Sequence, residues 1–319
     1  MADFVNIKLF LDKINSGKAV LPVKIAVTVA VVYLVNKSLP KNGLSGLAER
    51  ISPGYSSLAI IIGFLIFFIQ ARRWRVVLAS SGINIDEATA WRTMLWGCLL
   101  AFITPGRTGE FFRGISLPAN RKSDTVWAVA ADKILAGFGV IAAGAISLPV
   151  CFLYHSRIMW PHWTIGAASV AFFSGIYMVY MLRHRKAVRK VLDRAPVFTG
   201  KKLCEVCIYS VSAQVLCCIQ TAVLFRMFGG CFSVLSLSAA GMAYTFMMLF
   251  PFFIANMGIR EFSFGMFLSG YFSSAGQSGV ADIAFGASMG ILAINIVLPA
   301  LAGLCWWLIY KKDMAARVF

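Results

Sequence analysis

The sequence predicts an all-α, polytopic integral membrane protein with a single domain over residues 1–319. Hydrophobic residues make up 59% of the chain and charged residues 13%, whereas charged residues make up about 25% of a soluble domain. The apolar residues gather in runs that suit membrane helices, and no long polar stretch is left for a soluble domain. Two charged segments interrupt these runs, and we expect the rest of the chain to hold them inside the membrane.

The net charge of +17 lies mostly in short loops between apolar runs. Lys and Arg in such loops mark the cytoplasmic side of the membrane and contact anionic lipid head groups. The strongest marker is residues 183–202, with eight basic residues against one acidic residue. We therefore exclude nucleic acid as a partner.

The two interrupting segments have the same character. Residues 103–113 read ITPGRTGEFFR and residues 255–262 read ANMGIREF, so each offers Gly, Arg, Glu and Phe in that order. An ionisable residue at membrane depth costs about 2.5–3.5 kcal/mol on insertion scales. Such residues call for a functional explanation.

In the first half, residues 19–36 and 57–71 are predicted to span the membrane. Residues 72–78 combine basic residues with a Trp beside an apolar face. This pattern is typical of a helix at the membrane surface, and equally of a stop-transfer cluster.

A re-entrant hairpin is predicted next. Residues 93–104 are apolar but reach only about 18 Å into a hydrocarbon core of about 30 Å. The chain turns at Pro105-Gly106 and returns through residues 111–117 to a basic end, so the hairpin enters from the cytoplasmic face. The alternative is two short full spans with the motif at the far interface.

Residues 124–154 form a long predicted helix in which Asp132 and Lys133 are adjacent. Neighbouring residues on a helix do not face each other, so each needs a different partner or has to reach the membrane interface. The later predicted spans are a helix ending at Leu182, residues 205–227 and residues 282–310; a second hairpin is predicted from residues 233–253 and 262–271.

The order is therefore span, span, hairpin, span, twice over, with about six full spans. Three crossings per half invert the second half (about 159–319) relative to the first (about 1–158), as in many transporters. This topology places both termini in the cytoplasm. The protein itself is expected in the cell (inner) membrane. The alternative architecture has eight to ten full spans.

The breaks form the candidate substrate-binding site. A half-helix that begins near the membrane centre points free N–H groups inward, and arginine adds a planar fork suited to phosphate. The candidate residues are Arg107, Glu110, Arg113, Asp132, Lys133, Asn256, Arg260 and Glu261. Under the alternative, the Arg and Glu residues only neutralise each other and lock the two hairpins together.

No catalytic residue, metal site or cofactor is expected. Most of the eight cysteines lie in apolar runs, and the three histidines are scattered. Cys204 and Cys207 form a single C-x-x-C without a second pair or a nearby His, which makes a poor zinc site.

Several of these segments together resemble a known family. The run Arg72-Arg73-Trp74-Arg75 leads through Ser81-Gly82-Ile83 to the break at residues 105–113, and Gly258-Ile259-Arg260-Glu261 follows late in the chain. This pattern is similar to the transmembrane (flippase) domain of lysylphosphatidylglycerol synthases, and more narrowly to stand-alone relatives that lack the synthase domain. The resemblance implies movement of lipids between leaflets. This chain departs from the family pattern at Ala136, where an Asp is expected.

The leading hypothesis is a flippase or transporter for an anionic or polyprenyl-phosphate-linked lipid, and not an enzyme. One alternative is a membrane enzyme that transfers lipid head groups. Another is an accessory subunit that anchors a partner membrane enzyme through the basic loop. Assembly into a homo-oligomer is also possible.

The inverted topology makes a labelling prediction. In a background without other accessible cysteines, a reporter cysteine near Lys190 should react only after the membrane is permeabilised, because residues 183–202 are strongly basic. A reporter near Ser278, in a nearly uncharged loop, should react from outside. Reaction of both sites from the same side would rule out the inverted repeat.

Overall fold

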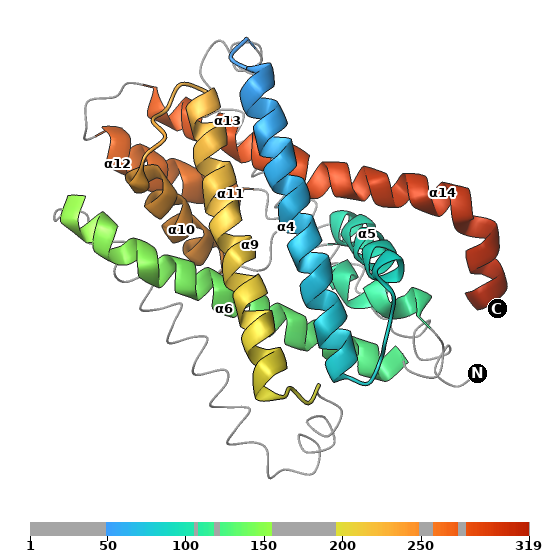
Figure 1. The fold of residues 1–319 in the computed structure, drawn as a ribbon. Helices are drawn as coiled ribbons and strands as arrows, with labels where there is room; N and C mark the ends of the chain where they lie inside the picture. Colours follow the sequence, from blue (N-terminus) through green and yellow to red (C-terminus); the bar gives the residue numbers. More distant parts are fainter. Residues whose placement is uncertain are drawn as a thin grey trace, which may run out of the picture.

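The computed structural model describes residues 49–104, 108–117, 122–154, 196–248, 258–273 and 279–318. All regular structure in these ranges is helical, as predicted, and no strand occurs in them (Figure 1). The helices are α4 (Pro53–Ser80), α5 (Glu87–Ile103), η1 (Thr108–Ser116), α6 (Lys122–Tyr154), α9 (Gly200–Met227), α10 (Val234–Met248), α11 (Ile259–Phe264), η3 (Gly265–Ser269), α12 (Gly270–Ser273), α13 (Val280–Leu292), η4 (Ala293–Val297) and α14 (Leu298–Val318).

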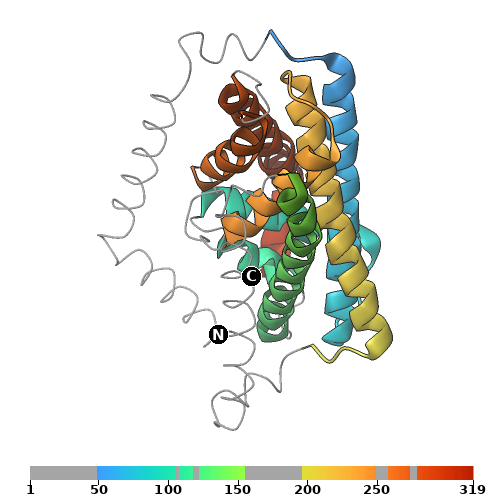
Figure 2. The same cartoon turned by 90° about the vertical axis from the view of Figure 1, so that its left-hand side faces the viewer.

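The long helices α4 and α9 lie side by side and run in opposite directions (Figures 1 and 2). Pro53 begins α4, where its missing N–H costs no helical hydrogen bond. The Thr199 side chain caps α9 by accepting a hydrogen bond from the N–H of Lys202. Further along, the side-chain amide of Gln220 donates to the carbonyl of Ala59 at 2.8 Å. The Gln220–Ala59 hydrogen bond joins the two helices at this position.

Small residues let the other helices approach closely. A Cβ on Gly139 of α6 would lie 2.5 Å from the carbonyl oxygen of Ser210 on α9. A Cβ on Gly241 of α10 would lie 2.3 Å from the hydroxyl oxygen of Ser147 on α6. Such small-residue contacts are typical of helix packing in membranes, where van der Waals contact replaces the hydrophobic effect as the driving force.

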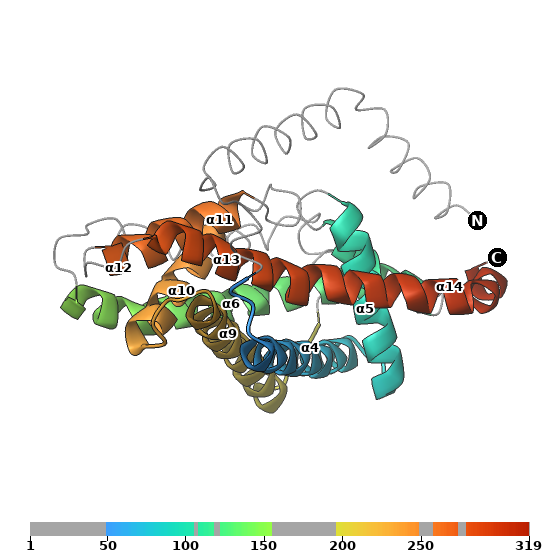
Figure 3. The same cartoon turned by 90° about the horizontal axis from the view of Figure 1, so that it is seen from above.

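The chain ends in one long rod, formed by α13, η4 and α14 (Figure 3). Its middle, η4, is π-helical, and there Asn295 exchanges hydrogen bonds with Gln220 of α9. Beyond this point α14 packs on α5, where a Cβ on Gly303 would lie 2.4 Å from the carbonyl oxygen of Leu95.

The distribution of polarity is that of a membrane protein. Large apolar side chains such as Ile61, Phe64 and Ile146 are exposed, whereas Arg73, Asp132 and Arg260 are buried. Four helices in the described ranges are long and apolar enough to cross a bilayer: Pro53–Ser80, Asp124–Cys151, Gly200–Met227 and Val280–Trp306.

The structure corrects the interpretation of residues 72–78 as a surface helix. They continue α4 without interruption to Ser80, and Arg73 and Trp74 are buried. The reason is that both side chains find buried partners: Arg73 contacts Asp132, and the indole N–H of Trp74 donates to Thr93 at 3.0 Å.

The two predicted hairpins correspond to pairs of packed segments. Helix α5 begins at Glu87, so it has 17 residues and is about 26 Å long rather than about 18 Å; η1 returns along it. Helix α10 packs against α11, with the Tyr244 and Phe264 rings 5.5 Å apart edge to face. The depth of either pair in a bilayer and the inverted repeat stay predictions, and residues 19–36 and 183–195 lie outside the described ranges.

The close contact at Gly139 predicts a stability effect. Gly139→Val should destabilise the protein by about 1–3 kcal/mol, because the opposing atom is backbone and cannot move away alone. Gly54→Ala is the control, since a Cβ there meets nothing within 4 Å. Thermal unfolding in detergent measures both, and equal melting temperatures would contradict this account of the α6–α9 interface.

Candidate functional site

The first break folds tightly against the helix before it. The N–H of Gly109 donates to the side-chain oxygen of Thr104 at 2.6 Å, and a Cβ on Gly109 would lie 2.2 Å from the carbonyl oxygen of Leu100. A Cβ on Gly114 would collide with Thr125 of α6. The glycines therefore let η1 lie between α5 and α6. The returning segment η1 is a 3₁₀ helix.

This packing assembles a buried charge cluster around Asp132 of α6. Arg73 of α4 donates to it from Nε at 2.8 Å and from Nη2 at 3.4 Å. Arg113 of η1 donates from Nη2 at 2.7 Å. All three side chains are at most 7% exposed. One carboxylate thus joins three segments and leaves one positive charge in excess.

Aromatic and sulfur contacts hold Arg113 further. Its guanidinium carbon lies 3.7 Å from the centroid of the Trp74 ring, a cation–π contact. Its Nη1 donates to the sulfur of Met94 at 3.2 Å, and its Nε has no hydrogen-bond partner among the described residues. Arg113 is therefore a buried cation whose Nε–H donor has no acceptor among the described residues.

Lys133 pairs with Glu110 instead of sharing the partners of Asp132. This confirms the prediction that the two adjacent residues on α6 need different partners. The Lys133 side chain is 38% exposed while Glu110 is buried, so this pair lies at the edge of the cluster.

The second break forms a separate buried cluster. Gly258 has φ +87°, a conformation that favours glycine, and its N–H donates to Glu261. Glu261 also accepts from Arg260 and, at 2.9 Å, from the hydroxyl of Ser288 on α13. Because Glu261 already caps the N–H of Gly258, this helix start is partly satisfied from within the chain.

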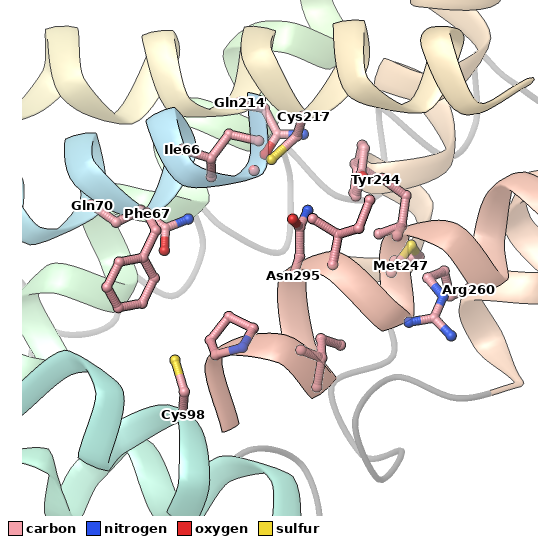
Figure 4. Close-up of a pocket in the computed structure, with 15 residues that line it drawn as sticks. Ile66, Phe67, Gln70, Cys98, Gln214, Cys217, Tyr244, Met247, Arg260 and Asn295 are labelled. Atoms are coloured by element: carbon pink, nitrogen blue, oxygen red, sulfur yellow. The ribbon is translucent and has the colours of Figure 1, made fainter. Parts of the chain in front are cut away.

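Arg260 keeps one side of its guanidinium unpaired. Its Nε donates to Ser288 at 2.9 Å and its Nη2 contacts Glu261, but Nη1 has no hydrogen-bond partner among the described residues. The side chain is 1% exposed and borders a cavity of about 230 Å³, shown in Figure 4. A buried guanidinium that borders a cavity, and has a donor without a partner among the described residues, is suited to an anionic ligand.

A second cavity of about 190 Å³ lies against the first cluster. It is bordered by the charged residues of that cluster: Arg73, Glu110, Arg113, Asp132 and Lys133. Ala136, the position that departs from the family pattern, also borders it. The wall therefore carries a methyl group there instead of a further carboxylate.

The structure brings together most of the predicted site residues. Glu110, Arg113, Asp132 and Lys133 form the first cluster, and Arg260 and Glu261 the second. Arg107 and Asn256 lie outside the described residues.

Sequence analysis missed Arg73 and Ser288. Arg73 was assigned to a surface or stop-transfer cluster, although its basic neighbours Arg72 and Arg75 are not buried. Ser288 gave no signal, because a single Ser in an apolar run is common. No group of three metal-binding side chains occurs in the described ranges.

Helices of spanning length around buried ion pairs define a polytopic membrane protein with an internal polar site. The sequence model described as lysylphosphatidylglycerol synthase TM region matches residues 22–294, and the chain belongs to this family. Membership indicates a function related to membrane lipids. No curated protein and no solved structure matches the chain significantly.

The Asp132 cluster makes a stability prediction. Asp132→Ala should destabilise the protein by about 3–5 kcal/mol, because it leaves two buried guanidinium groups without their anion. Glu87→Ala is the matched control: it removes the partner of Arg72 in a pair whose side chains are 41% and 39% exposed, and such pairs contribute about 0–1 kcal/mol. A melting temperature lowered equally by both changes would contradict the central role of Asp132.

Proposed function

We propose that the protein moves a lipid with an anionic, phosphate-bearing head group between the leaflets of the cell membrane. The observation that carries the proposal is Arg260: it is buried, its Nη1 has no partner among the described residues, and it borders a cavity. A phosphate could accept hydrogen bonds from this face while its tails stay in lipid.

The charge balance of the site supports an anionic ligand. Four basic side chains, Arg73, Arg113, Lys133 and Arg260, border the two cavities, together with the carboxylates of Glu110 and Asp132. With Glu261, which forms an ion pair with Arg260, the formal excess is one positive charge. A ligand phosphate would reduce this excess in a medium where uncompensated charge is costly.

In this proposal the protein moves lipid without making or breaking covalent bonds. A lipid with a single phosphate, such as phosphatidylglycerol or a polyprenyl phosphate, has the chemistry that the site requires. We propose that both termini are cytoplasmic, as the basic segments indicate. In this proposal the direction in which the lipid moves between the leaflets is set by the lipid gradient or by a coupled gradient across the membrane.

Transport by Arg260 variants tests the proposal. Arg260→Ala should reduce the translocation of labelled phosphatidylglycerol in proteoliposomes by about tenfold or more, because hydrogen bonds to charged groups contribute about 1.5–3 kcal/mol. Arg260→Lys should not restore the full rate, since an ammonium cannot replace a bidentate fork. Arg107→Ala should lower transport as well.

Two further variants separate substrate binding from a structural lock. Arg72→Ala is the control, because Arg72 pairs with Glu87 at the surface and borders neither cavity. The Arg260→Ala/Glu261→Ala double variant should stay inactive although it removes both buried charges. Transport recovered in the double variant would overturn the proposal in favour of the lock. Recovered lipid of unchanged mass is expected, and a mass shift would favour a lipid-modifying enzyme.

A further inference from the structure

The two cavities share part of their walls. Gln70 of α4, Cys98 of α5, and Gln214 and Cys217 of α9 border both of them. In Figure 4, Gln70 and Cys98 lie on the left of the first cavity and Gln214 and Cys217 lie at the top, while Arg260 lies on the right. We propose that this junction joins the two charged clusters into one anion-selective route. In this route Gln214 binds the lipid head group as it passes from one cavity to the other. This inference rests on the proposed function and adds the path within it.

The electrostatics of the route favour an anion along its length. The second cavity has a formal excess of one positive charge, from three basic against two acidic side chains. At the first cavity Arg260 borders the cavity, whereas its ion-pair partner Glu261 does not. The junction between them is uncharged. Low-dielectric walls focus the field of like charges into such a passage. A phosphate therefore meets an arginine side chain at either end and no carboxylate at the junction itself.

Gln214 has the hydrogen-bonding capacity that the junction requires. Its buried Nε2 donates to no oxygen or nitrogen acceptor among the described residues. Cys218, one turn further along α9, offers it only a sulfur, which is a weak acceptor. A phosphate oxygen would be a better acceptor, so the amide can bind a passing head group and release it without leaving a charge behind.

Gln220, on the same helix, shows the contrast. Its amide exchanges hydrogen bonds with Asn295 at 2.7 and 3.1 Å and donates to the carbonyl of Ala59 at 2.8 Å. It is 0% exposed and has strong acceptors for its amide, so it holds α4, α9 and η4 together. Gln214 has the same chemistry but no comparable bonds, which separates a ligand-binding amide from a structural one.

The native thiols at the junction allow a test that does not depend on transport. In full-length variants that keep only Cys98 or only Cys217, an anionic sulfonatoethyl methanethiosulfonate and its cationic trimethylammonium analogue are compared. We expect each thiol to react about tenfold or more faster with the anionic reagent than with the cationic one, after each rate is divided by the rate of the same reagent with a free model thiol. A variant that keeps only Cys231, which is exposed and borders neither cavity, should show no such preference.

Occupancy by lipid should protect the same thiols. Phosphatidylglycerol in the detergent should slow labelling of Cys98 and Cys217, whereas phosphatidylcholine and inorganic phosphate at equal concentration should not. Protection by inorganic phosphate alone would assign the site to a free anion and overturn the lipid route. A lack of labelling, or equal labelling by both reagents, would overturn the anion-selective junction.

Gln214 variants complete the test. Gln214→Leu should abolish translocation of phosphatidylglycerol while the lipid-induced rise in melting temperature persists, because both charged ends remain. Gln214→Asn should retain part of the transport. Wild-type transport without charge-selective labelling would refute the route and leave the proposed function standing. Charge-selective labelling without transport would refute the proposed function and leave the anion-selective route standing.

Discussion

The buried carboxylate of Asp132 is the interaction on which the first half of the structure depends. It accepts hydrogen bonds from Arg73 and Arg113, which come from α4 and η1. In an apolar surrounding, two guanidinium groups without an anion would be very costly, so the three segments cannot separate independently. The cluster also determines the shape of the break, because Arg113 must reach back over Trp74 to contact it.

The second cluster is balanced differently. Glu261 accepts from Arg260, Ser288 and the N–H of Gly258, so one carboxylate serves a side chain, a neighbouring helix and a turn. Arg260 still has a donor that the described residues do not use. Both clusters thus join helices, and each also contains a guanidinium nitrogen, Nε of Arg113 or Nη1 of Arg260, that has no hydrogen-bond partner among the described residues.

Irregular helix geometry accompanies the polar interior. Two π-helical segments, Gly265–Ser269 and Ala293–Val297, interrupt the helices that border the second cluster. The second of them places Asn295 against Gln220 and beside the larger cavity. Single π-helical turns occur frequently at functional sites because they redirect side chains without ending the helix. Here they combine a continuous apolar exterior with an interior that contains amides and cations.

The sequence by itself determined the all-helical membrane class, the two charged breaks and six of the proposed site residues that the structure describes. The reason is that hydropathy, helix breakers and intramembrane charges are local properties of the chain. That Asp132 and Lys133 have separate partners was one of the two outcomes that helix geometry predicted.

Only the tertiary structure decided which charges meet. A basic residue beside an apolar run has the same sequence pattern whether it faces lipid head groups or the interior, so Arg73 could not be told from Arg72 or Arg75 until α6 placed Asp132 beside it. The junction of Gln70, Cys98, Gln214 and Cys217 comes from the consecutive helices α4 and α5 and from α9, which lies much later in the chain. Its existence depends on how α4, α5 and α9 cross, which is a property of packing and not of any single segment.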